Sequence, residues 1–509
     1  MSATPTTDND DEGRRHVRVA VIGAGFTGLA TVALLRDQGI RDFVVLERAG
    51  DVGGVWRDNS YPGIACDVPS HLYSLSFAPN PDWRRTFSSG GQIWEYMQKV
   101  AADLRMPDCT RFGEEVLDAS WDEDRQRWAL RTTTLELTAD VVVDGTGVLA
   151  DPTFPQIDGL DGFQGRLFHS ARWDHEHDLT GERVAVVGSG ASAVQLVPAI
   201  QPLAATVTVF QRTPAWVMPR VDRDISALER RLLRAVPALQ RLLRAGQDVT
   251  RDRVLLQVMR RPAVRRVGEA VSKAYLRRTI ADPALRAKLT PSFELGCKRI
   301  LITSTWYPAL AQPNVDVVAS GVREVRARSI VAHDGTEHEV DTIVFATGFH
   351  VADPPIAARV HGRDGRSLAQ AWGDNPRTYR GVSVAGFPNF FRIGATGTGT
   401  GHTSQILQIE SGVRYLGDAL KVMDDRELAS VEVTPQSQAA YARMLHDMAC
   451  ETVWVTGGCE SWYLDASGEA SALWPSSARH YRRLTEHFDP GAYRLVGRAG
   501  LGAATPAPA

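Results

Sequence analysis

Two glycine-rich segments, each enclosed by apolar sequence, constrain the fold of this chain more than any other feature. From Val17 the chain reads VRVAVIGAGFTGLATVALLRDQG, which is an apolar run, a glycine turn and apolar residues at helical spacing, and a second apolar run, FVVLE, follows. From Gly181 the segment GERVAVVGSGASAVQLVPAI, followed by TVTVFQR, repeats this order. Because a strand, glycine turn, helix and strand form a dinucleotide-binding unit, the sequence predicts an α/β protein with two Rossmann-like domains.

Two later apolar runs that end in a Thr-Gly turn, ADVVVDGTG and VDTIVFATG, are interpreted as the strands that close these units. The order of the openings and closings predicts nested domains. We expect the first domain over residues 16–150 and 352–495, and the second domain over residues 151–351. Residues 1–15 and 496–509 are polar or of low complexity and are expected to be disordered tails.

A change to long helical patterns at about residues 224–290 predicts a helical insertion in the second domain. Within Asp222–Lys288 the chain holds seventeen basic residues against seven acidic ones. We interpret this excess as a solvated helical face, with Leu228, Leu232 and Leu233 turned toward the core. Steering of an anionic cofactor and loose contact with a membrane are the alternatives.

Composition argues against several other classes of protein, namely nucleic-acid-binding, disulfide-rich, metal-binding and membrane-spanning proteins. The 509 residues carry a net charge of -3 and are 43% hydrophobic, which is typical of a globular protein without a field that attracts nucleic acid. The cysteines are odd in number, scattered and without a C-x-x-C pair, so they indicate no disulfide framework, no metal site and a reducing, cytoplasmic setting. They are Cys66, Cys109, Cys297, Cys450 and Cys459. No apolar run reaches the roughly 18 residues of a membrane-spanning helix.

The first glycine motif, Gly23-x-Gly25-x-x-Gly28, is typical of an FAD site. Its glycines allow a tight turn, close approach of a pyrophosphate to backbone N–H groups and tight packing of the helix, whose N-terminus adds partial positive charge. Glu47 ends the next strand, where its carboxylate can accept hydrogen bonds from ribose hydroxyls. The sequence therefore predicts FAD at this site.

The second motif, Gly188-x-Gly190-x-x-Ala193, differs from the first at the end of its second strand. Arg212 stands at the position that carries the glutamate in the first site, and Thr213 follows it. A guanidinium binds a 2'-phosphate with two hydrogen bonds, and the threonine can act as a second phosphate ligand. The second site is therefore predicted to bind NADPH.

Between the two glycine motifs lies FQGRLFHSARWDH, which matches the fingerprint F-x-G-x-x-x-H-x-x-x-W-(P/D) of the type I Baeyer-Villiger monooxygenases. The fixed positions are Phe163, Gly165, His169, Trp173 and Asp174. The chain thus resembles these class B flavoprotein monooxygenases, and the resemblance covers nearly its whole length. It implies that the fingerprint is a hinge that couples the positions of the domains to turnover. A plain structural histidine in a turn is the alternative reading of its central residue.

Three further segments carry the resemblance. GGVWRDNSYPGIACD is similar to the family's second signature through Gly54, Trp56, Tyr61, Pro62, Gly63 and Asp67. GCKRILITSTWYPAL looks like the segment with the family's active-site arginine, which falls on Arg299 after Lys298, and CESWYLD resembles the segment that places Trp462 at the nicotinamide. The resemblance implies that Gly54, Trp56, Asp67, Lys298 and Trp462 contact the cofactors.

The implied activity is an FAD- and NADPH-dependent insertion of one oxygen atom of O2 next to a ketone carbonyl, through a flavin peroxide, to give an ester or lactone. Arg299 would stabilise the peroxide anion and the negative oxygen that develops on the ketone, while Asp67 would fix the guanidinium. The alternatives are a sister enzyme that oxygenates nitrogen or sulfur and a catalytically silent FAD/NADPH scaffold. The identity of the ketone and the oligomeric state stay open.

Overall fold

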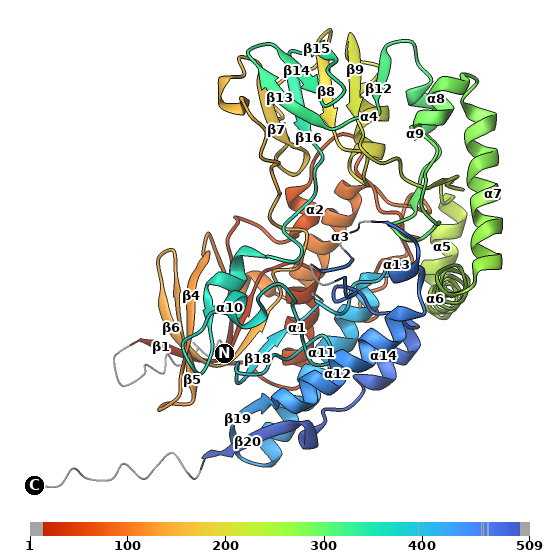
Figure 1. Cartoon of the computed structure of the whole chain (residues 1–509). Helices are drawn as coiled ribbons and strands as arrows, with labels where there is room; N and C mark the ends of the chain where they lie inside the picture. The colour runs from red at the N-terminus through yellow and green to blue at the C-terminus, as the bar shows by residue number, and fades with distance from the viewer. Residues whose placement is uncertain (1–13, 395, 460, 462, 466–467, 499–509) are drawn as a thin grey trace, which may run out of the picture.

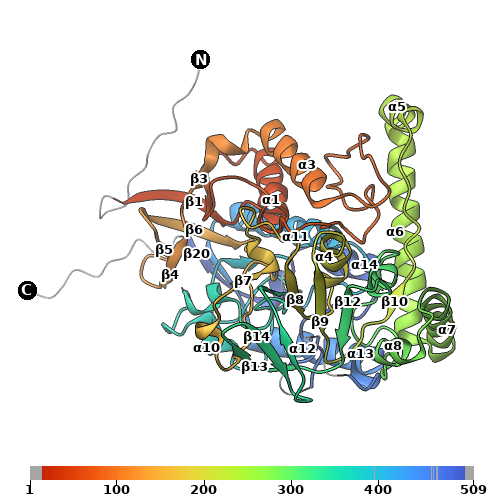
Figure 2. The ribbon, with the colours of Figure 1, turned by 90° about the horizontal axis from the view of Figure 1, so that it is seen from above.

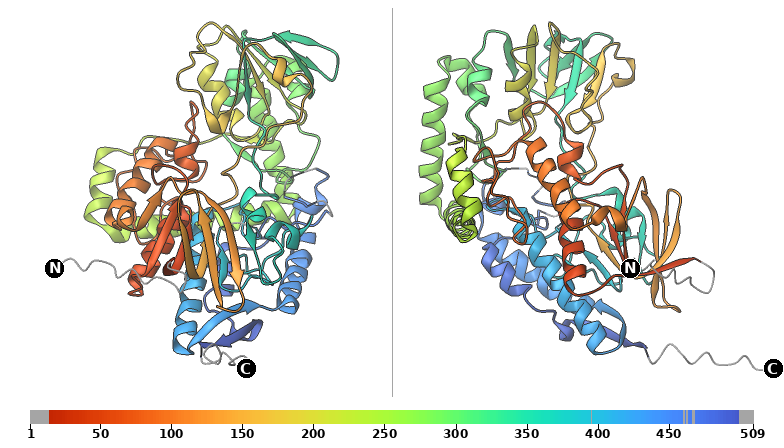
Figure 3. Two further views of the ribbon diagram at one scale, coloured as in Figure 1. Left: turned by 90° about the vertical axis from the view of Figure 1, so that its left-hand side faces the viewer. Right: turned by 180° about the vertical axis from the view of Figure 1, so that it is seen from behind.

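A computed structural model describes residues 14–394, 396–459, 461, 463–465 and 468–498, and it shows an α/β protein built on two sheets (Figure 1). The sheet that contains β1 lies in the lower half of Figure 1, and the sheet that contains β8 lies in the upper half. Each of the two glycine motifs follows a central strand of one sheet. Figure 3 shows from two more sides that the two sheets are separate layers of the molecule.

The first sheet has the strand order β17-β4-β5-β6-β1-β2-β3, with β18 paired to β6. Its strands are β1 (Arg15–Ile22), β2 (Phe43–Glu47), β3 (Thr110–Phe112), β4 (Val116–Asp122), β5 (Arg127–Thr132), β6 (Glu136–Asp144), β17 (Val360–His361) and β18 (Phe390–Arg392). Strands β6, β1, β2 and β3 run parallel, and β4 and β5 add an antiparallel hairpin. Buried valines on β1, β2 and β6 form the interior between this sheet and its helices.

The helices around the first sheet come from both ends of the chain. Helix α1 (Phe26–Asp37) packs against α11 (Gln405–Asp425), so residues far apart in the sequence cover one face together. The others are α2 (Val55–Asp58), α3 (Gly90–Asp103), α10 (Leu368–Trp372), α12 (Pro435–Cys450), α13 (Val453–Thr456) and α14 (Ala478–Leu484). Strands β19 (Leu428–Val433) and β20 (Tyr493–Gly497) pair antiparallel beside them.

The second sheet is parallel throughout, with the order β12-β9-β8-β16-β7. Its strands are β7 (Arg166–His169), β8 (Arg183–Val187), β9 (Thr206–Phe210), β12 (Val315–Val318) and β16 (Thr342–Phe345). It packs against α4 (Ala193–Ile200) and α9 (Trp306–Leu310). Small sheets add β13 (Val322–Arg326), β14 (Ser329–Ala332) and β15 (Glu337–Glu339), and pair β10 (Val217–Met218) with β11 (Leu301–Ile302).

Four helices lie between β10 and β11, along one side of the molecule (Figure 2). They are α5 (Ala227–Ala235), α6 (Pro237–Arg260), α7 (Pro262–Thr279) and α8 (Pro283–Lys288). The prediction that three leucines of α5 face the core is wrong for two of them. Leu233 is buried, but Leu228 and Leu232 are 77% and 49% exposed, because these two are one helical turn apart on a side that none of the described elements covers.

The predicted tails overlap the ends of two strands, so their boundaries need correction. Arg15 begins β1, where it pairs with Leu137 of β6, and Val496 and Gly497 pair with β19. The remaining positions of both predicted tails lie almost wholly outside the described residues. None of the helices in the described part of the chain has the length and apolar content that crossing a bilayer requires.

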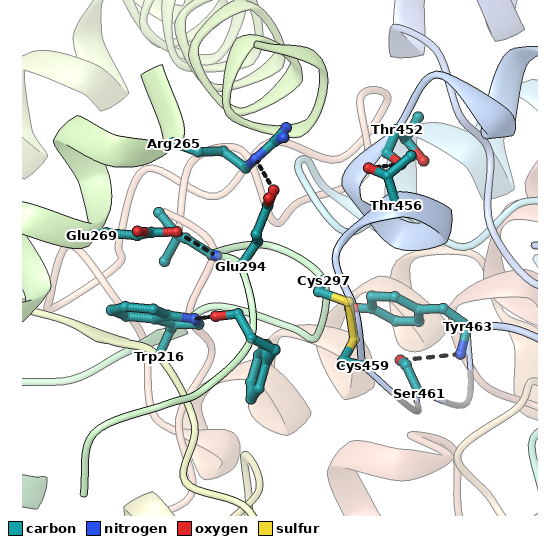
Figure 4. Close-up of a disulfide and its surroundings, with 12 residues drawn as sticks. Trp216, Arg265, Glu269, Glu294, Cys297, Thr452, Thr456, Cys459, Ser461 and Tyr463 are labelled. Carbon is teal, nitrogen blue, oxygen red and sulfur yellow. Dashed lines mark hydrogen bonds and ion pairs between the residues drawn. A yellow bond between two sulfur atoms is a disulfide. The ribbon is translucent and has the colours of Figure 1, made fainter. Parts of the chain in front are cut away.

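The prediction that the cysteines form no disulfide is wrong. Cys297 and Cys459 are bonded although 162 positions separate them in the sequence (Figure 4). Cys66 is buried, Cys109 is partly buried and Cys450 is exposed, and all three are free thiols. The bond joins the segment that precedes β11 to the segment that follows α13. Sequence spacing gave no hint of this pairing, and with it the argument for a reducing setting loses its support.

Quantifying thiols tests this bond directly. In denaturant without a reductant, alkylation is expected to modify three cysteines per chain, and after reduction all five. The intact-mass difference between the two samples gives the count. Peptide mapping of the unreduced sample must then contain the linked Cys297–Cys459 peptides; five modified cysteines before reduction would contradict the structure.

A buried ion pair fastens β18 to the end of β6. The guanidinium of Arg392 donates from Nη1 to Oδ2 of Asp144, and both side chains are essentially inaccessible to solvent. Oδ1 of Asp144 accepts from the backbone N–H and hydroxyl of Thr146 at 3.0 and 2.7 Å. The pair therefore orients the turn that follows β6.

Removing one member of this pair is expected to destabilise the protein strongly. Arg392→Ala leaves the Asp144 carboxylate buried without its cation, which typically costs roughly 3 to 5 kcal/mol. Urea unfolding of the variant and the parent measures the difference. Arg366→Ala is the matched control, because its pair with Asp364 is exposed and such pairs contribute only about 0 to 1 kcal/mol. Equal stability of the two variants would contradict the prediction.

Candidate active site

Asp67 and Arg299 form a two-point ion pair although they come from distant parts of the chain. Arg299 Nη2 lies 2.7 Å from Oδ1 and 2.8 Å from Oδ2, and Nε lies 3.2 Å from Oδ2. The carboxylate thus occupies the Nε and Nη2 edge of the guanidinium. No described residue accepts a hydrogen bond from Nη1, and the Arg299 side chain is 41% exposed. One edge of a fixed cation is therefore available to another acceptor.

The electrostatics of the pair favour both charges. Burial disfavours the charged form of Asp67, but the Arg299 guanidinium outweighs it and holds the pKa of the carboxyl below its ordinary value. Attraction to Asp67 likewise raises the pKa of Arg299 above its ordinary value, although partial burial of the guanidinium acts in the opposite direction. The two groups therefore remain charged across the physiological pH range.

Contacts on both sides fix the segment that leads to Arg299. Trp216 Nε1 donates to the carbonyl oxygen of Phe293 at 2.8 Å, and Arg265 of α7 lies 2.7 Å from the carboxylate of Glu294 (Figure 4). Helix α7 therefore holds this segment from one side, and the disulfide described above holds it from the other. Helix α7 and the disulfide together therefore fix the position of Arg299.

The loop after α13 reaches the same place from the C-terminal part of the chain. Tyr463 is buried, its ring lies beside the Cys297–Cys459 bond in Figure 4, and burial raises its pKa to about 12. Arg299 is close enough to act on that pKa. Trp462, to which the sequence assigned nicotinamide contact, lies outside the described residues. Lys298 lies over the ring of Phe293, with Nζ 5.4 Å from its centroid.

Two charged residues of α6 near the site were missed by sequence reasoning. Arg251 is close enough to Asp67 and Arg299 to interact with both, and its burial lowers the pKa of its guanidinium. Asp252 is buried beside it and accepts a hydrogen bond from the backbone N–H of Ala478 at 2.9 Å. The sequence held one indication of them, the adjacent charges Arg251 and Asp252 inside a predicted helix. That helix was interpreted as a solvated surface, so the two residues were not assigned to the site.

The first glycine motif has the shape that a dinucleotide requires. A Cβ on Gly28 would collide with the carbonyl oxygen of Gly23, so this glycine is needed for packing. A Cβ on Gly25 would meet only the Cα of Gly54, at 4.0 Å. The middle glycine, at the start of α1, therefore faces open space where a pyrophosphate could approach backbone N–H groups.

Glu47 lies where the first site needs a carboxylate. It is buried at the end of β2, and its oxygens accept from the backbone N–H groups of Ala24 and Ala49 at 2.8 and 2.9 Å. Arg57 is 3.2 Å away. Because Oε1 already accepts from both Ala49 and Arg57, Oε2 retains the lone pair that can accept a ribose hydroxyl. Trp56 lies in the same segment and donates to the Tyr73 hydroxyl at 3.1 Å.

The second glycine motif repeats this shape after β8. A Cβ on Gly188 would collide with the carbonyl oxygen of Ala346, whereas a Cβ on Gly190 would meet nothing within 4 Å. Ala193 is fully buried at the first position of α4. The middle glycine again faces open space at the beginning of a helix, which fits a second dinucleotide.

Arg212 follows β9 and is exposed. Within the described part of the chain it forms no ion pair with a carboxylate. The next residue, Thr213, accepts a hydrogen bond through its carbonyl oxygen from the Ser189 hydroxyl of the glycine loop at 3.3 Å. The backbone that follows Arg212 therefore lies beside the second glycine motif, and the exposed guanidinium is available to an anion.

The fingerprint histidine lies at the junction of the two sheets. His169 is buried at the end of β7, where Nδ1 accepts from the backbone N–H of Ala171 at 3.0 Å. Its ring centroid is 5.5 Å from that of Phe154 and 5.8 Å from that of Phe349, which belong to the two connections between the sheets. Burial, together with Arg172, lowers its pKa to about 4. His169 is therefore a neutral ring packed against both connections.

The other fingerprint residues have packing roles around this histidine. A Cβ on Gly165 would collide with the carbonyl oxygen of Asp341, and Phe163 packs against the core of the second sheet. Trp173 stacks edge-on against Phe168, with centroids 5.0 Å apart. The Asp174 carboxylate accepts the backbone N–H of Glu176 at 3.1 Å.

The loop that ends in Asp67 is attached to the second sheet through helix α4. Gln195 of α4 accepts from the Tyr61 hydroxyl at 2.9 Å and from the backbone N–H of Ala65 at 3.2 Å, and it donates to the carbonyl of Ala65 at 2.8 Å. A Cβ on Gly63 would collide with the backbone of this helix. The structure thus brings Asp67 and the second glycine motif together.

The comparisons with known proteins agree with this geometry. The family model for flavin-binding monooxygenase-like proteins matches residues 16–237. Cyclohexanone monooxygenase from Rhodococcus sp. Phi1, in a structure bound to NADP+, has a TM-score of 0.85 and 27% identity, covering 95% of this chain and 100% of that chain. An oxidized steroid monooxygenase bound to NADP has a TM-score of 0.83 and 29% identity, covering 94% and 99%.

Sequence identity is higher with a curated relative. A Baeyer-Villiger monooxygenase of Streptomyces coelicolor is 53% identical over 484 residues, which cover 94% of this chain and 93% of that protein. The match extends over nearly the whole chain. The chain therefore belongs to the Baeyer-Villiger monooxygenases.

Proposed function

We propose that this protein uses NADPH and O2 to convert a ketone into an ester or lactone, with FAD bound at the first glycine motif. The observation that carries the proposal is the Asp67–Arg299 pair, which leaves the Nη1 edge of a fixed guanidinium available. An enzyme that oxygenates amines or sulfides does not need a cation that stabilises a carbonyl oxygen. A silent scaffold has no need of this arrangement either.

FAD held at the first glycine motif and reduced by NADPH would supply the redox chemistry that activates O2 for the insertion. The protein contributes charge and orientation. Arg299 would donate from Nη1 to the ketone oxygen, on which negative charge develops as the carbonyl carbon is attacked. Asp67 would hold the guanidinium so that no reorganisation is needed when that charge appears.

The remaining cofactor contacts are proposed from the shapes of the two motifs. Gly23, Gly25, Gly28, Glu47, Gly54, Trp56 and Asp67 would surround FAD, and Gly188, Gly190, Ala193, Arg212, Thr213, Lys298 and Trp462 would surround NADPH. The open space at the two middle glycines and the buried carboxylate of Glu47 support this division.

We also propose the domain division predicted from the sequence. Residues 16–150 and 352–495 would form the FAD domain, and residues 151–351 the NADPH domain with its helical insertion at about 224–290. The two separate sheets support this division. The fingerprint, from Phe163 to Asp174, would couple the positions of the domains, because His169 contacts both connections. A cytoplasmic location stays a prediction, supported by the need for cellular NADPH.

Cofactor selectivity tests the role of Arg212. Arg212→Ala is expected to lower kcat/KM for NADPH by roughly ten- to a hundred-fold, because the 2'-phosphate loses a charge-assisted hydrogen bond. The value for NADH, which lacks this phosphate, should stay close to that of the parent. Steady-state kinetics with both cofactors measure the ratio, and Arg426→Ala, an exposed arginine elsewhere, is the control. An unchanged ratio in Arg212→Ala would refute the assignment.

Product analysis tests the role of Arg299. Arg299→Ala should retain FAD and oxidise NADPH, but it should release hydrogen peroxide in place of ester or lactone. Loss of one preorganised donor typically lowers the rate of the chemical step about 100- to 1000-fold. Gas chromatography of the product, peroxide quantification and stopped-flow reduction of the flavin separate this effect from slower reduction.

Two further variants serve as controls for this experiment. Arg299→Lys keeps the charge but loses the planar fork, so partial activity is expected. Asp67→Asn should couple NADPH oxidation to product less well than the parent, because the guanidinium loses its ionic partner. Ester formation by Arg299→Ala at the parental rate would show that the mechanism is wrong. A parent that oxygenates only amines or sulfides would favour the sister activity.

A further inference from the structure

The outer side of helices α5, α6 and α7 combines large apolar side chains with positive charge. Nine of the sixteen large hydrophobic side chains that are exposed in the described chain lie between Ser226 and Thr279. They are Leu228, Leu232, Val236, Leu242, Leu243, Val249, Val254, Val267 and Val271. Isolated exposed apolar residues are ordinary, but a concentration of this kind on one set of helices marks an interaction surface.

The helical spacing arranges these residues as stripes. On α6, Leu242 and Val249 are seven residues apart, and the small residues Ala238 and Ala245 share their side. On α7, Val267 and Val271 are one turn apart. The same relation holds for Leu228 and Leu232 on α5. Each helix therefore presents an apolar stripe to solvent, in addition to the side that it buries.

The charges on this side have one sign. Every exposed charged residue of α5, α6 and α7 is an arginine: Arg231, Arg234, Arg241, Arg253, Arg266, Arg277 and Arg278. Within the described part of the chain, only Arg234 of these has a carboxylate partner, Asp82. We call the exposed leucines, valines and arginines of α5–α7 the basic apolar face.

The acidic residues of the same helices are directed elsewhere. Asp252 contacts His402 at 3.1 Å, and Asp248 contacts Arg482 at 3.5 Å, so both carboxylates of α6 are directed to the C-terminal part of the chain. Glu229 is paired with Arg223, and Glu269 accepts the backbone N–H of Leu295. The basic apolar face therefore has no exposed negative charge of its own.

We propose that the basic apolar face docks this protein on the surface of an anionic lipid bilayer. Amphipathic helices with arginine beside leucine bind at the boundary between headgroups and acyl chains, where the arginines meet anionic headgroups and the apolar stripe leaves water. Arginine carries its charge on a long stem that reaches headgroups while the valines and leucines insert. The helices lie along one side of the molecule, where a flat surface could reach them (Figures 2 and 3).

The positive charge of the basic apolar face favours an anionic bilayer over a second copy of the chain as its partner. A symmetric dimer through the same face would bring two sets of unpaired arginines together, which is unfavourable. A fluid lipid boundary can adapt to side chains that protrude as far as Leu228 and Leu242, which are 77% and 69% exposed. A bilayer with negative headgroups satisfies both the apolar stripes and the arginines.

Vesicle sedimentation tests the proposal with the FAD-loaded full chain. One set of vesicles is pure phosphatidylcholine, and the other is an equal mixture of phosphatidylcholine and phosphatidylglycerol. We expect binding to the mixed vesicles, little binding to the neutral ones, and release by salt. Each arginine near an anionic surface contributes about five-fold to the partition coefficient, so Arg231→Gln/Arg241→Gln/Arg253→Gln should weaken binding roughly 100-fold.

Matched variants distinguish binding through the basic apolar face from nonspecific adsorption to vesicles. Leu232 and Leu203 are 49% and 50% exposed, and only the first lies on the face. Leu228→Ser/Leu232→Ser/Leu242→Ser should lose binding, whereas Leu203→Ser and Arg426→Gln should bind like the parent. Melting temperature and FAD content show that each variant is folded.

Three results would overturn the proposal. These are equal binding to both kinds of vesicle, parental binding by the arginine or leucine variants, and no binding by the parent at low salt. Sedimentation velocity is run beside the vesicles. A dimer that Leu228→Ser/Leu232→Ser/Leu242→Ser abolishes would assign the face to a second copy. Monooxygenase activity in solution is not a readout, so failure of the docking proposal leaves the proposed function untouched.

Discussion

The two-point pair between Asp67 and Arg299 is the constraint on which the arrangement of the site depends. A bidentate carboxylate–guanidinium pair fixes distance and plane together, so both backbones must be held within a narrow range of positions. The loop before Asp67 is fixed by Gln195 of α4, and the segment before Arg299 by α7 and by the disulfide of Cys297. One pair therefore ties the first sheet, the second sheet and the helical insertion to a common geometry.

The same dependence explains why the connections between the sheets are not plain linkers. His169 packs its neutral ring against Phe154 in one connection and Phe349 in the other. The Gln195 contacts join the Asp67 loop to α4 in the same way. The coupling of domain position to turnover that we propose would act through these contacts, with His169 at the shared point.

Local sequence was sufficient to predict the strands and helices whose formation depends on local patterns. The runs that contain β1, α1 and β2 show continuous apolar sequence for the strands and helical spacing between them, with a glycine turn before the helix, and the structure has these elements there. The disulfide could not be predicted, since its two cysteines meet only through tertiary packing. Arg251 was missed for the same reason: a helical pattern states which residues share a side but not which neighbour covers that side. The exposure of Leu228 and Leu232 was mispredicted on the same ground.

Helix α6 shows how one regular element can serve two environments. Arg251 is close enough to Asp67 to interact with it, and burial lowers the pKa of its guanidinium, while Asp252 contacts His402 at 3.1 Å. Leu242 and Val249 lie on its outer side in water. The side of α6 that carries Leu242 and Val249 is exposed in the N-terminal half of the helix, and the same side is buried three residues further on, at Asp252. Substitutions at Leu242 and Val249 therefore change exposed positions and leave Arg251 and Asp252 in place. The contact of Arg251 with the Asp67–Arg299 pair and the character of the exposed surface are therefore separable properties of one helix.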